Sequence, residues 1–158
     1  MNKSVAHSFP FSLPVSATNP AAELRRLLTT WSGLAAWGDR ARRFARTRVV
    51  LSSSYVSCAG RAQWGRRDGD WKIVVFARYN EDWHDFQSTL LHEMAHVATM
   101  YERADHGRRW RAAYIAAAAE VSGRDPSFFG VGDEVASPFT LDYLVRTALE
   151  FPISERAA

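Results

Sequence analysis

The segment LLHEMAHVATMYERADHG, residues 90–107, contains three of the five histidines of this 158-residue chain. On an α-helix, residues four positions apart share a face and lie about 6 Å apart along the axis. His92 and His96 can therefore both reach one metal ion, and neutral imidazole is a favoured zinc ligand. Glu93 lies next to that face, where its carboxylate can take a proton from a water on the metal. This is the H-E-x-x-H arrangement of zinc hydrolases.

A catalytic zinc site needs a third protein ligand and one open position. We expect His106 to be that ligand, because a helix ending near residue 103 and a tight turn would return it to the metal. Glu120, on the next predicted helix, is the alternative. Glu102 is a weaker candidate because it would face away from the metal on a continuing helix. We interpret His84 as a helix-start or supporting residue.

The chemistry expected of this site is hydrolysis of an amide bond. A zinc-bound water has a pKa of about 7. Glu93 would accept its proton as the water attacks the carbonyl and would then protonate the leaving amine. Tyr79, Tyr101 and Arg109 are candidates for a further group that stabilises the oxyanion, and the sequence does not choose among them.

The elements before this segment predict a helix and three strands. Asn19-Pro20 is typical of a helix start, and apolar residues at helical spacing predict a helix from about residue 20 to the mid-30s. Residues 39–45 could form a further helical turn. We expect a strand over 48–56. The segment after it has the pattern of a hairpin, with arms at 61–66 and 71–78 and its turn at Arg67-Asp68-Gly69-Asp70.

Two helices are predicted after the strands, from about residue 82 or 85 to 103 and over 108–121. The fold class is therefore α+β: an N-terminal helix, a three-stranded antiparallel-type sheet, the HExxH helix and a following helix. We expect a flexible leader at 1–18, a core at 19–125, and a C-terminal extension at 126–158 that packs on the core, with a short helix at 140–150.

Composition limits the compartment and the partners. The single cysteine, Cys58, excludes an internal disulfide and a cysteine-rich zinc ribbon. Pro10 and Pro14 break the apolar stretch of the leader, which argues against a signal peptide. No apolar run approaches the roughly 20 residues that cross a bilayer. We expect a cytoplasmic monomer with no membrane partner, with association with the nucleoid as a further possibility.

Basic residues are almost all arginine, and the net charge is +3. Arginine pairs with phosphate, and aromatic residues beside it suit single-stranded DNA. Trp64, Trp71 and Trp110 lie near the arginines, although such tryptophans are usually core residues and such arginines usually solvated. The clusters are Arg40, Arg42, Arg43, Arg46 and Arg48; Arg61, Arg66 and Arg67; and Arg103, Arg108, Arg109 and Arg111. The candidate DNA contacts are Arg40, Arg42, Arg43, Arg46, Arg61 and Arg66.

The continuation of HEMAH by His106-Gly107, with Trp110 three positions further on, resembles the SprT-like zinc metallopeptidase domain of the SprT/Spartan family. The order of Ala59-Gly60-Arg61-Ala62, the strand KIVVFARYN and the HExxH helix fits too, so the resemblance covers about residues 20–123. It implies a zincin-like fold, with zinc on His92, His96 and His106 and with Glu93 as general base. Family members such as Spartan are DNA-dependent proteases that digest proteins crosslinked to DNA.

The resemblance is incomplete in two respects. The cysteine ribbon that bacterial SprT proteins usually carry is excluded by the single cysteine, and Val97-Ala98-Thr99 replaces the glycine and histidine that mark metzincins. We therefore expect a zinc-dependent endopeptidase, with DNA dependence and crosslink repair implied only by the family. The alternatives are a zinc-stabilised module that binds nucleic acid without catalysis and a zinc hydrolase of small amides.

Overall fold

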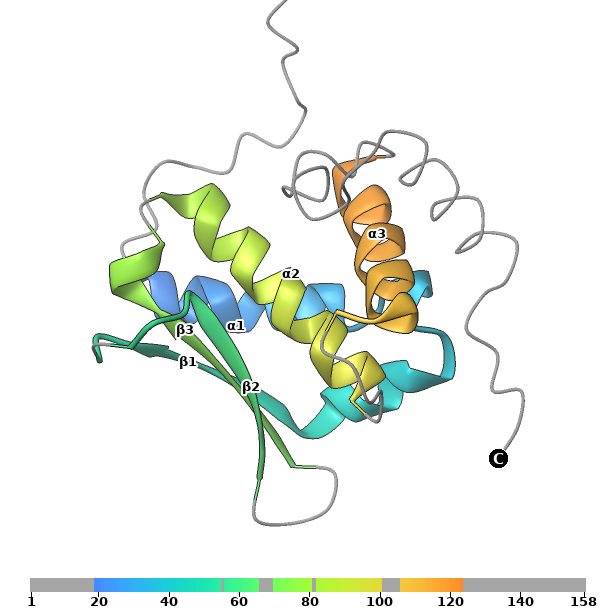
Figure 1. Cartoon of the computed structure of the whole chain (residues 1–158), viewed down its shortest axis with the longest axis horizontal. Helices are drawn as coiled ribbons and strands as arrows, with labels where there is room; N and C mark the ends of the chain where they lie inside the picture. The colour runs from blue at the N-terminus through green and yellow to red at the C-terminus, as the bar shows by residue number, and fades with distance from the viewer. Residues whose placement is uncertain (1–18, 55, 66–69, 81, 101–105, 124–158) are drawn as a thin grey trace, which may run out of the picture.

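The computed structural model describes residues 19–54, 56–65, 70–80, 82–100 and 106–123 (Figure 1). The expected α+β class is confirmed. The predicted leader, the C-terminal extension and its helix at 140–150 lie outside the described residues. In chain order the elements are α1 (Pro20–Trp31), η1 (Ala35–Arg46), β1 (Thr47–Ser52), β2 (Gly60–Trp64), β3 (Trp71–Phe76), η2 (Ala77–Tyr79), α2 (Trp83–Thr99) and α3 (Arg108–Ser122).

The three strands form one sheet in the order β1-β3-β2. The predicted hairpin is confirmed, because β2 and β3 pair antiparallel with Trp64 opposite Trp71. β1, however, pairs parallel with β3, so the sheet is mixed rather than antiparallel throughout. β3 is the central strand of the sheet. β2 pairs with one of its edges and β1 with the other, and β1 runs in the same direction as β3. Turn chemistry fixes only the hairpin, and no local signal states which edge β1 joins.

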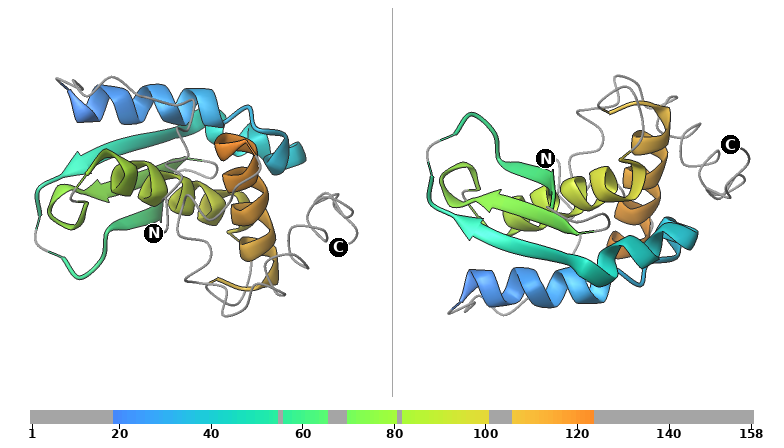
Figure 2. Two further views of the ribbon diagram at one scale, coloured as in Figure 1. Left: turned by 90° about the horizontal axis from the view of Figure 1, so that it is seen from above. Right: turned by 90° about the horizontal axis from the view of Figure 1, so that it is seen from below.

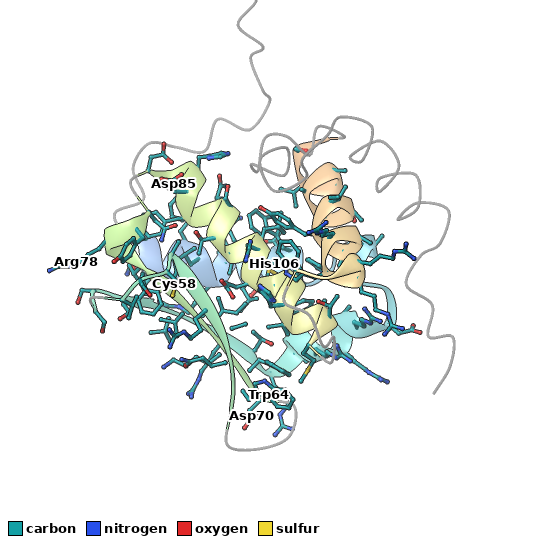
Figure 3. The ribbon with its side chains drawn as sticks, viewed as in Figure 1. Cys58, Trp64, Asp70, Arg78, Asp85 and His106 are labelled. Atoms are coloured by element: carbon teal, nitrogen blue, oxygen red, sulfur yellow. The ribbon has the colours of Figure 1, made fainter. Side chains whose placement is uncertain are left out.

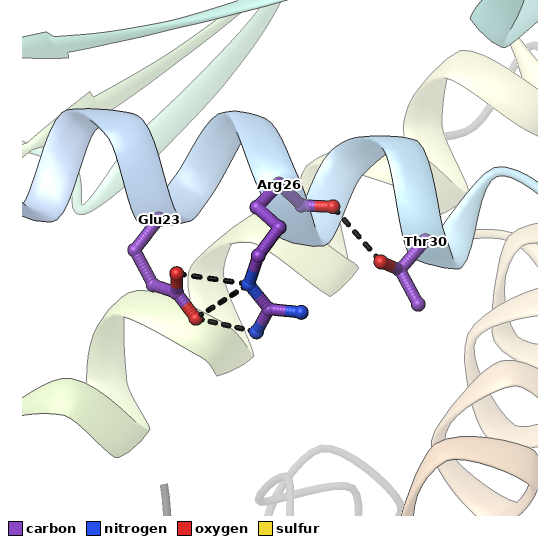
Figure 4. Close-up of polar contacts among 3 residues, drawn as sticks. All are labelled: Glu23, Arg26 and Thr30. Carbon is purple, nitrogen blue, oxygen red and sulfur yellow. Dashed lines mark hydrogen bonds and ion pairs between the residues drawn. The ribbon is translucent and has the colours of Figure 1, made fainter. Parts of the chain in front are cut away.

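Helix α1 begins where the sequence predicts but ends at Trp31, before the mid-30s that the spacing suggested. The Asn19 side chain accepts a hydrogen bond from the Ala22 amide at 3.0 Å, and Pro20 occupies the first turn. On the exposed side of the helix, the Arg26 guanidinium donates to both oxygens of Glu23, and the Thr30 hydroxyl donates to the Arg26 carbonyl (Figure 4). The hydrogen bonds from Arg26 lower the pKa of Glu23. Such exposed pairs contribute about 0–1 kcal/mol.

One hydrophobic core joins the helices to the central strand. Alternate residues of β3, Trp71, Ile73 and Val75, belong to it and are at most 5% exposed. α1 lies along β1, whereas α2 packs on β2 and β3 and also contacts α3 (Figure 2). The helices contribute Leu24, Leu27 and Leu28 from α1, Leu90, Leu91 and Met94 from α2, and Trp110, Ala113 and Ile115 from α3.

The connection η1 ties the first half of the chain to the end of α2. It contains a kink at Gly38, whose φ of 53° is in the left-handed region. The indole of Trp37 is fully buried and donates to the Trp31 carbonyl. Arg43 donates to the Ala98 carbonyl at 2.5 Å and to the Val97 carbonyl at 3.4 Å. A cation at a helix C-terminus stabilises it, so Arg43 holds the last turn of α2.

Candidate metal centre

The three histidines of the 90–107 segment meet at one point. The distances between their Nε2 atoms are 3.3 Å for His92 and His96, 3.2 Å for His96 and His106, and 3.0 Å for His92 and His106. Three nitrogens bound to one tetrahedral zinc at about 2.0–2.1 Å would lie about 3.3 Å from one another. The triangle therefore has nearly the size that a zinc ion requires, and the residues present fit a metal.

Helix α2 supplies two corners of this triangle. Its N-terminal cap is Asp82, whose side chain accepts from the Asp85 amide at 2.9 Å. Leu90, Leu91, Met94 and Val97 bury the opposite faces of the helix and fix its rotation about its axis. With that rotation set, His92 and His96 point to the same side, as their four-residue spacing predicts.

His106 reaches the other two histidines from outside the helix. Its φ of 57° lies in the left-handed region, which few residues other than glycine adopt. The Arg111 guanidinium donates to the His106 carbonyl at 2.9 Å, and the Arg111 amide donates to the Gly107 carbonyl at 3.0 Å. These bonds hold the turn at the start of α3, so that the His106 side chain lies between α2 and α3 (Figure 3).

The Trp110 ring packs against all three rings of the histidine cluster. It is 2% exposed, and its ring centroid lies 4.6 Å from that of His92, 5.2 Å from that of His96 and 4.2 Å from that of His106. Tyr114 packs against Trp110 and His92 from the next turn of α3. A rigid aromatic surface on one side restricts all three imidazoles to a narrow range of orientations.

Burial keeps His92 neutral. The pKa of His92 is lowered from 6.5 to about 3, mainly because the ring is removed from water and to a smaller extent because of the neighbouring His96 and His106. At neutral pH the ring therefore keeps a free lone pair, which is the form that binds a metal.

Glu93 lies beside the cluster in an open cleft. The Glu93 side chain is buried, with the residue only 6% exposed. The cleft has a volume of about 440 Å³ and runs between the histidines and β2. It is lined by Cys58, Gly60, Arg61, Ala62, Trp64, Trp71, His92, Glu93, His96, Met100 and His106.

The alternative ligands have other positions. Both carboxylate oxygens of Glu120 accept hydrogen bonds at 3.0 Å, from the Ala35 and Ala36 amides at the start of η1. Glu120 therefore caps η1 and is not part of the histidine cluster. His84 lies at the beginning of α2 with Asp82 and Asp85 in a separate group. Glu102 lies outside the described residues.

Of the candidate oxyanion groups, Tyr79 and Arg109 are exposed and do not line the described cleft. Tyr101 lies outside the described residues.

The arginines named as candidate DNA contacts differ in their burial and in the groups that they contact. Arg40 and Arg43 are half-buried, and Arg43 holds the end of α2. Arg42 is exposed, and the exposed Arg46 lies 3.3 Å from the Asp70 carboxylate. Arg61 lines the cleft, with its guanidinium 3.9 Å from the Cys58 sulfur. Arg66 lies outside the described residues.

The three tryptophans named with these arginines differ in their exposure. Trp71 and Trp110 are core residues, at 5% and 2% exposed. Trp64 is 62% exposed and packs on Trp71 at a centroid distance of 5.1 Å. The expectation that such tryptophans are usually core holds for two of the three, and Trp64 is the one whose side chain is largely exposed.

A model of the SprT-like family matches residues 24–126. The chain belongs to the SprT-like family. Searches of curated proteins and of solved structures found no match. Membership indicates a metallopeptidase-like domain, and the histidine cluster can hold a metal ion. None of the described helices is long and apolar enough to cross a bilayer.

The third ligand can be tested with two variants. His106→Gly removes one imidazole but suits a positive φ, so we expect unchanged or higher stability of the metal-free protein. Its zinc affinity should fall by more than the roughly 10–100-fold that removal of a supporting residue costs. Glu120→Ala should leave zinc affinity unchanged and lower the free energy of unfolding by about 1–2 kcal/mol, because two amides lose their acceptor. Calorimetric zinc titration and thermal unfolding measure both; the opposite pattern would assign the metal to Glu120.

The depressed pKa of His92 predicts how the stability of the metal-free protein depends on pH. The unfolded chain takes up a proton on this residue below pH 6.5, whereas the folded chain does so only at about pH 3. The stability contributed by the neutral ring is thus complete above pH 6.5 and is lost progressively toward pH 3. Denaturant unfolding of chelator-treated protein should show this fall, and His92→Asn should flatten it. Equal slopes in the two proteins would contradict the burial of His92.

Proposed function

We propose that this chain is a zinc-dependent endopeptidase. The observation that carries the proposal is the triangle of Nε2 atoms with the Glu93 carboxylate beside it in an open cleft. Structural zinc sites are closed by four protein ligands. Within the described ranges the cluster consists of three histidines, which matches a site that keeps one position for water or substrate.

The residues of the chain have separate roles in this proposal. His92, His96 and His106 would hold the ion, which when bound would supply Lewis acidity to a substrate carbonyl and to a water molecule. Glu93 accepts a proton from that water on a carboxylate oxygen and delivers it to the nitrogen of the departing amine. The burial of Glu93 reduces competition from bulk water for this proton.

The form of the cleft favours a polypeptide substrate over a small amide. β2 is the outer strand on this side of the described sheet, and three successive residues from Gly60 to Ala62 line the cleft with Trp64. An extended chain can lie along such an edge, whereas a small amide would leave most of the cleft unfilled.

The role of Glu93 is tested by Glu93→Gln, which keeps the size of the side chain but removes the base. We expect zinc affinity to stay within about twofold, because Glu93 is not a ligand. Cleavage of casein by zinc-loaded protein should fall by at least about a hundredfold. Glu23→Gln, on α1 and not in the lining of the cleft, is the matched control and should cleave like the wild type. A Glu93→Gln protein with wild-type activity would refute the proposed mechanism.

We further propose that single-stranded DNA binds beside the cleft and stimulates cleavage. The support is the exposed Trp64 and the exposed Arg61 lining one cleft, with the exposed Arg42 as an additional phosphate ligand. Stacking on one aromatic ring contributes about 1–3 kcal/mol per base. The competing function is that of a nucleic-acid-binding module without catalysis. Such a module would bind DNA and zinc but would cleave no protein substrate.

The DNA proposal predicts a steep dependence of affinity on salt. For single strands, each phosphate that the protein neutralises adds about 0.7 to the steepness of log K against log salt. We therefore expect Arg42→Gln and Arg61→Gln each to reduce the slope by that amount in fluorescence anisotropy titrations. Arg26→Gln removes the same charge from a residue paired with Glu23 on α1 and should leave the slope unchanged. A salt-independent affinity would exclude phosphate binding by these arginines.

A further inference from the structure

Gly60, the first residue of β2, lies against the face of α2 that carries Thr89 and Glu93. A Cβ atom at Gly60 would be 2.5 Å from the Thr89 methyl carbon Cγ2 and 2.9 Å from both Cγ and Oε1 of Glu93. Side-chain carbons do not pack against heavy atoms at less than about 3.0 Å in folded proteins. Only glycine therefore lets the backbone of β2 lie directly beside the Glu93 carboxylate.

Asn80 holds the strand at this distance. It is 4% exposed, and its amide nitrogen donates to the Ala59 carbonyl at 3.2 Å and to the Phe76 carbonyl at 2.8 Å. The Phe76 amide donates to the same Ala59 carbonyl at 2.9 Å. The residue immediately before Gly60 is thus fixed by two hydrogen bonds, one from the backbone of β3 and one from a buried side chain.

The same Asn80 also bonds to α2. Its Oδ1 accepts a hydrogen bond from the Thr89 hydroxyl at 2.6 Å. Thr89 is four positions before Glu93, so the two side chains lie on one face of α2. Asn80 therefore connects the start of β2 with the helical turn that precedes Glu93, and hydrogen bonds from such a buried side chain allow little relative movement.

We propose that Gly60, Asn80 and Thr89 are positioning residues for Glu93. Thr89 and Asn80 fix the separation of α2 and β2, and Gly60 leaves room for the carboxylate within that separation. The backbone at Gly60 then limits the side-chain conformations open to Glu93 and keeps its oxygens beside the histidine cluster. This inference rests on the proposed function, because it assigns these residues to the placement of the catalytic base.

The decisive variant is Gly60→Ala combined with Thr89→Ser. Thr89→Ser retains the hydroxyl that bonds to Asn80 but removes the methyl group that a Cβ at Gly60 would meet most closely. The double variant should therefore recover stability that Gly60→Ala alone loses. The conflict with Cγ and Oε1 of Glu93 remains, and Glu93 must move. A displacement of about 1 Å at a reacting group can reduce the rate about a hundredfold.

We expect the kcat of the folded, zinc-loaded double variant to fall about a hundredfold, with KM and zinc affinity within about twofold of the wild type. A crystal structure of this variant should show the Glu93 carboxylate displaced and the three imidazoles unmoved. Gly33→Ala is the matched control, because a Cβ there would meet only the Thr30 carbonyl oxygen at 3.7 Å. A double variant with wild-type kcat, or with Glu93 unmoved, would overturn the inference.

A second pair of variants tests the Asn80 bond and does not depend on the folding of the first. Thr89→Val removes the hydroxyl at nearly constant shape, whereas Thr89→Ser keeps it. We expect kcat to fall in Thr89→Val and to remain near the wild-type value in Thr89→Ser, when activity is expressed per zinc-loaded, folded molecule. Equal kcat values for the two variants would show that the bond contributes only to stability and would remove Thr89 and Asn80 from the inference.

The proposed function and the positioning role fail under different results. If Glu93→Gln cleaves protein as well as the wild type, then Glu93 is not the base and the proposed function fails. If Glu93→Gln is inactive but the Gly60→Ala, Thr89→Ser double variant keeps its kcat, then the proposed function stands and only the positioning role fails.

Discussion

The convergence of three imidazole nitrogens within 3.0–3.3 Å of one another is the interaction on which the site depends. Neutral rings that direct lone pairs at one point repel one another, and a cation at that point removes the repulsion. In the metal-free protein, the surrounding structure must hold the three rings together against this repulsion. It does so with a buried tryptophan below them, a helix with a fixed rotation on one side and a constrained turn on the other.

Three charged side chains that the sequence offers as ligands or phosphate contacts instead support the structure around the site. Arg43 holds the last turn of α2, Glu120 holds the start of η1, and Arg111 holds the turn before α3. Arg43 and Glu120 bond to backbone groups that a helix end leaves without partners within the helix, whereas Arg111 bonds to a carbonyl of the turn that precedes α3. Charged residues of this kind are easily taken for ligands or for phosphate contacts when only the sequence is considered, because their partners are distant in the chain.

Features that depend on neighbours in the sequence could be predicted, and features that depend on long-range packing could not. The helical period around His92 and His96, the Asn19 cap and the β2–β3 hairpin follow from local spacing and were all confirmed. The parallel pairing of β1 is set by the order of strands, for which the sequence has no local signal. The place of Gly60 beside Glu93 likewise arises from the packing of a strand on a helix 33 positions away. A glycine immediately before the predicted strand at 61–66 was the only available indication.

The site is assembled from two segments of the chain, since His92 and His96 belong to α2 whereas His106 follows ten positions after His96 and precedes α3. An ion bound by all three would join these segments as a crosslink does. A crosslink that persists in the unfolded chain lowers the entropy of that chain. The ion would not act in this way, because the unfolded chain does not hold its three ligands in place. Binding would therefore favour the folded state by mass action. The ion that the proposed function needs would therefore also strengthen the association of α2 with α3.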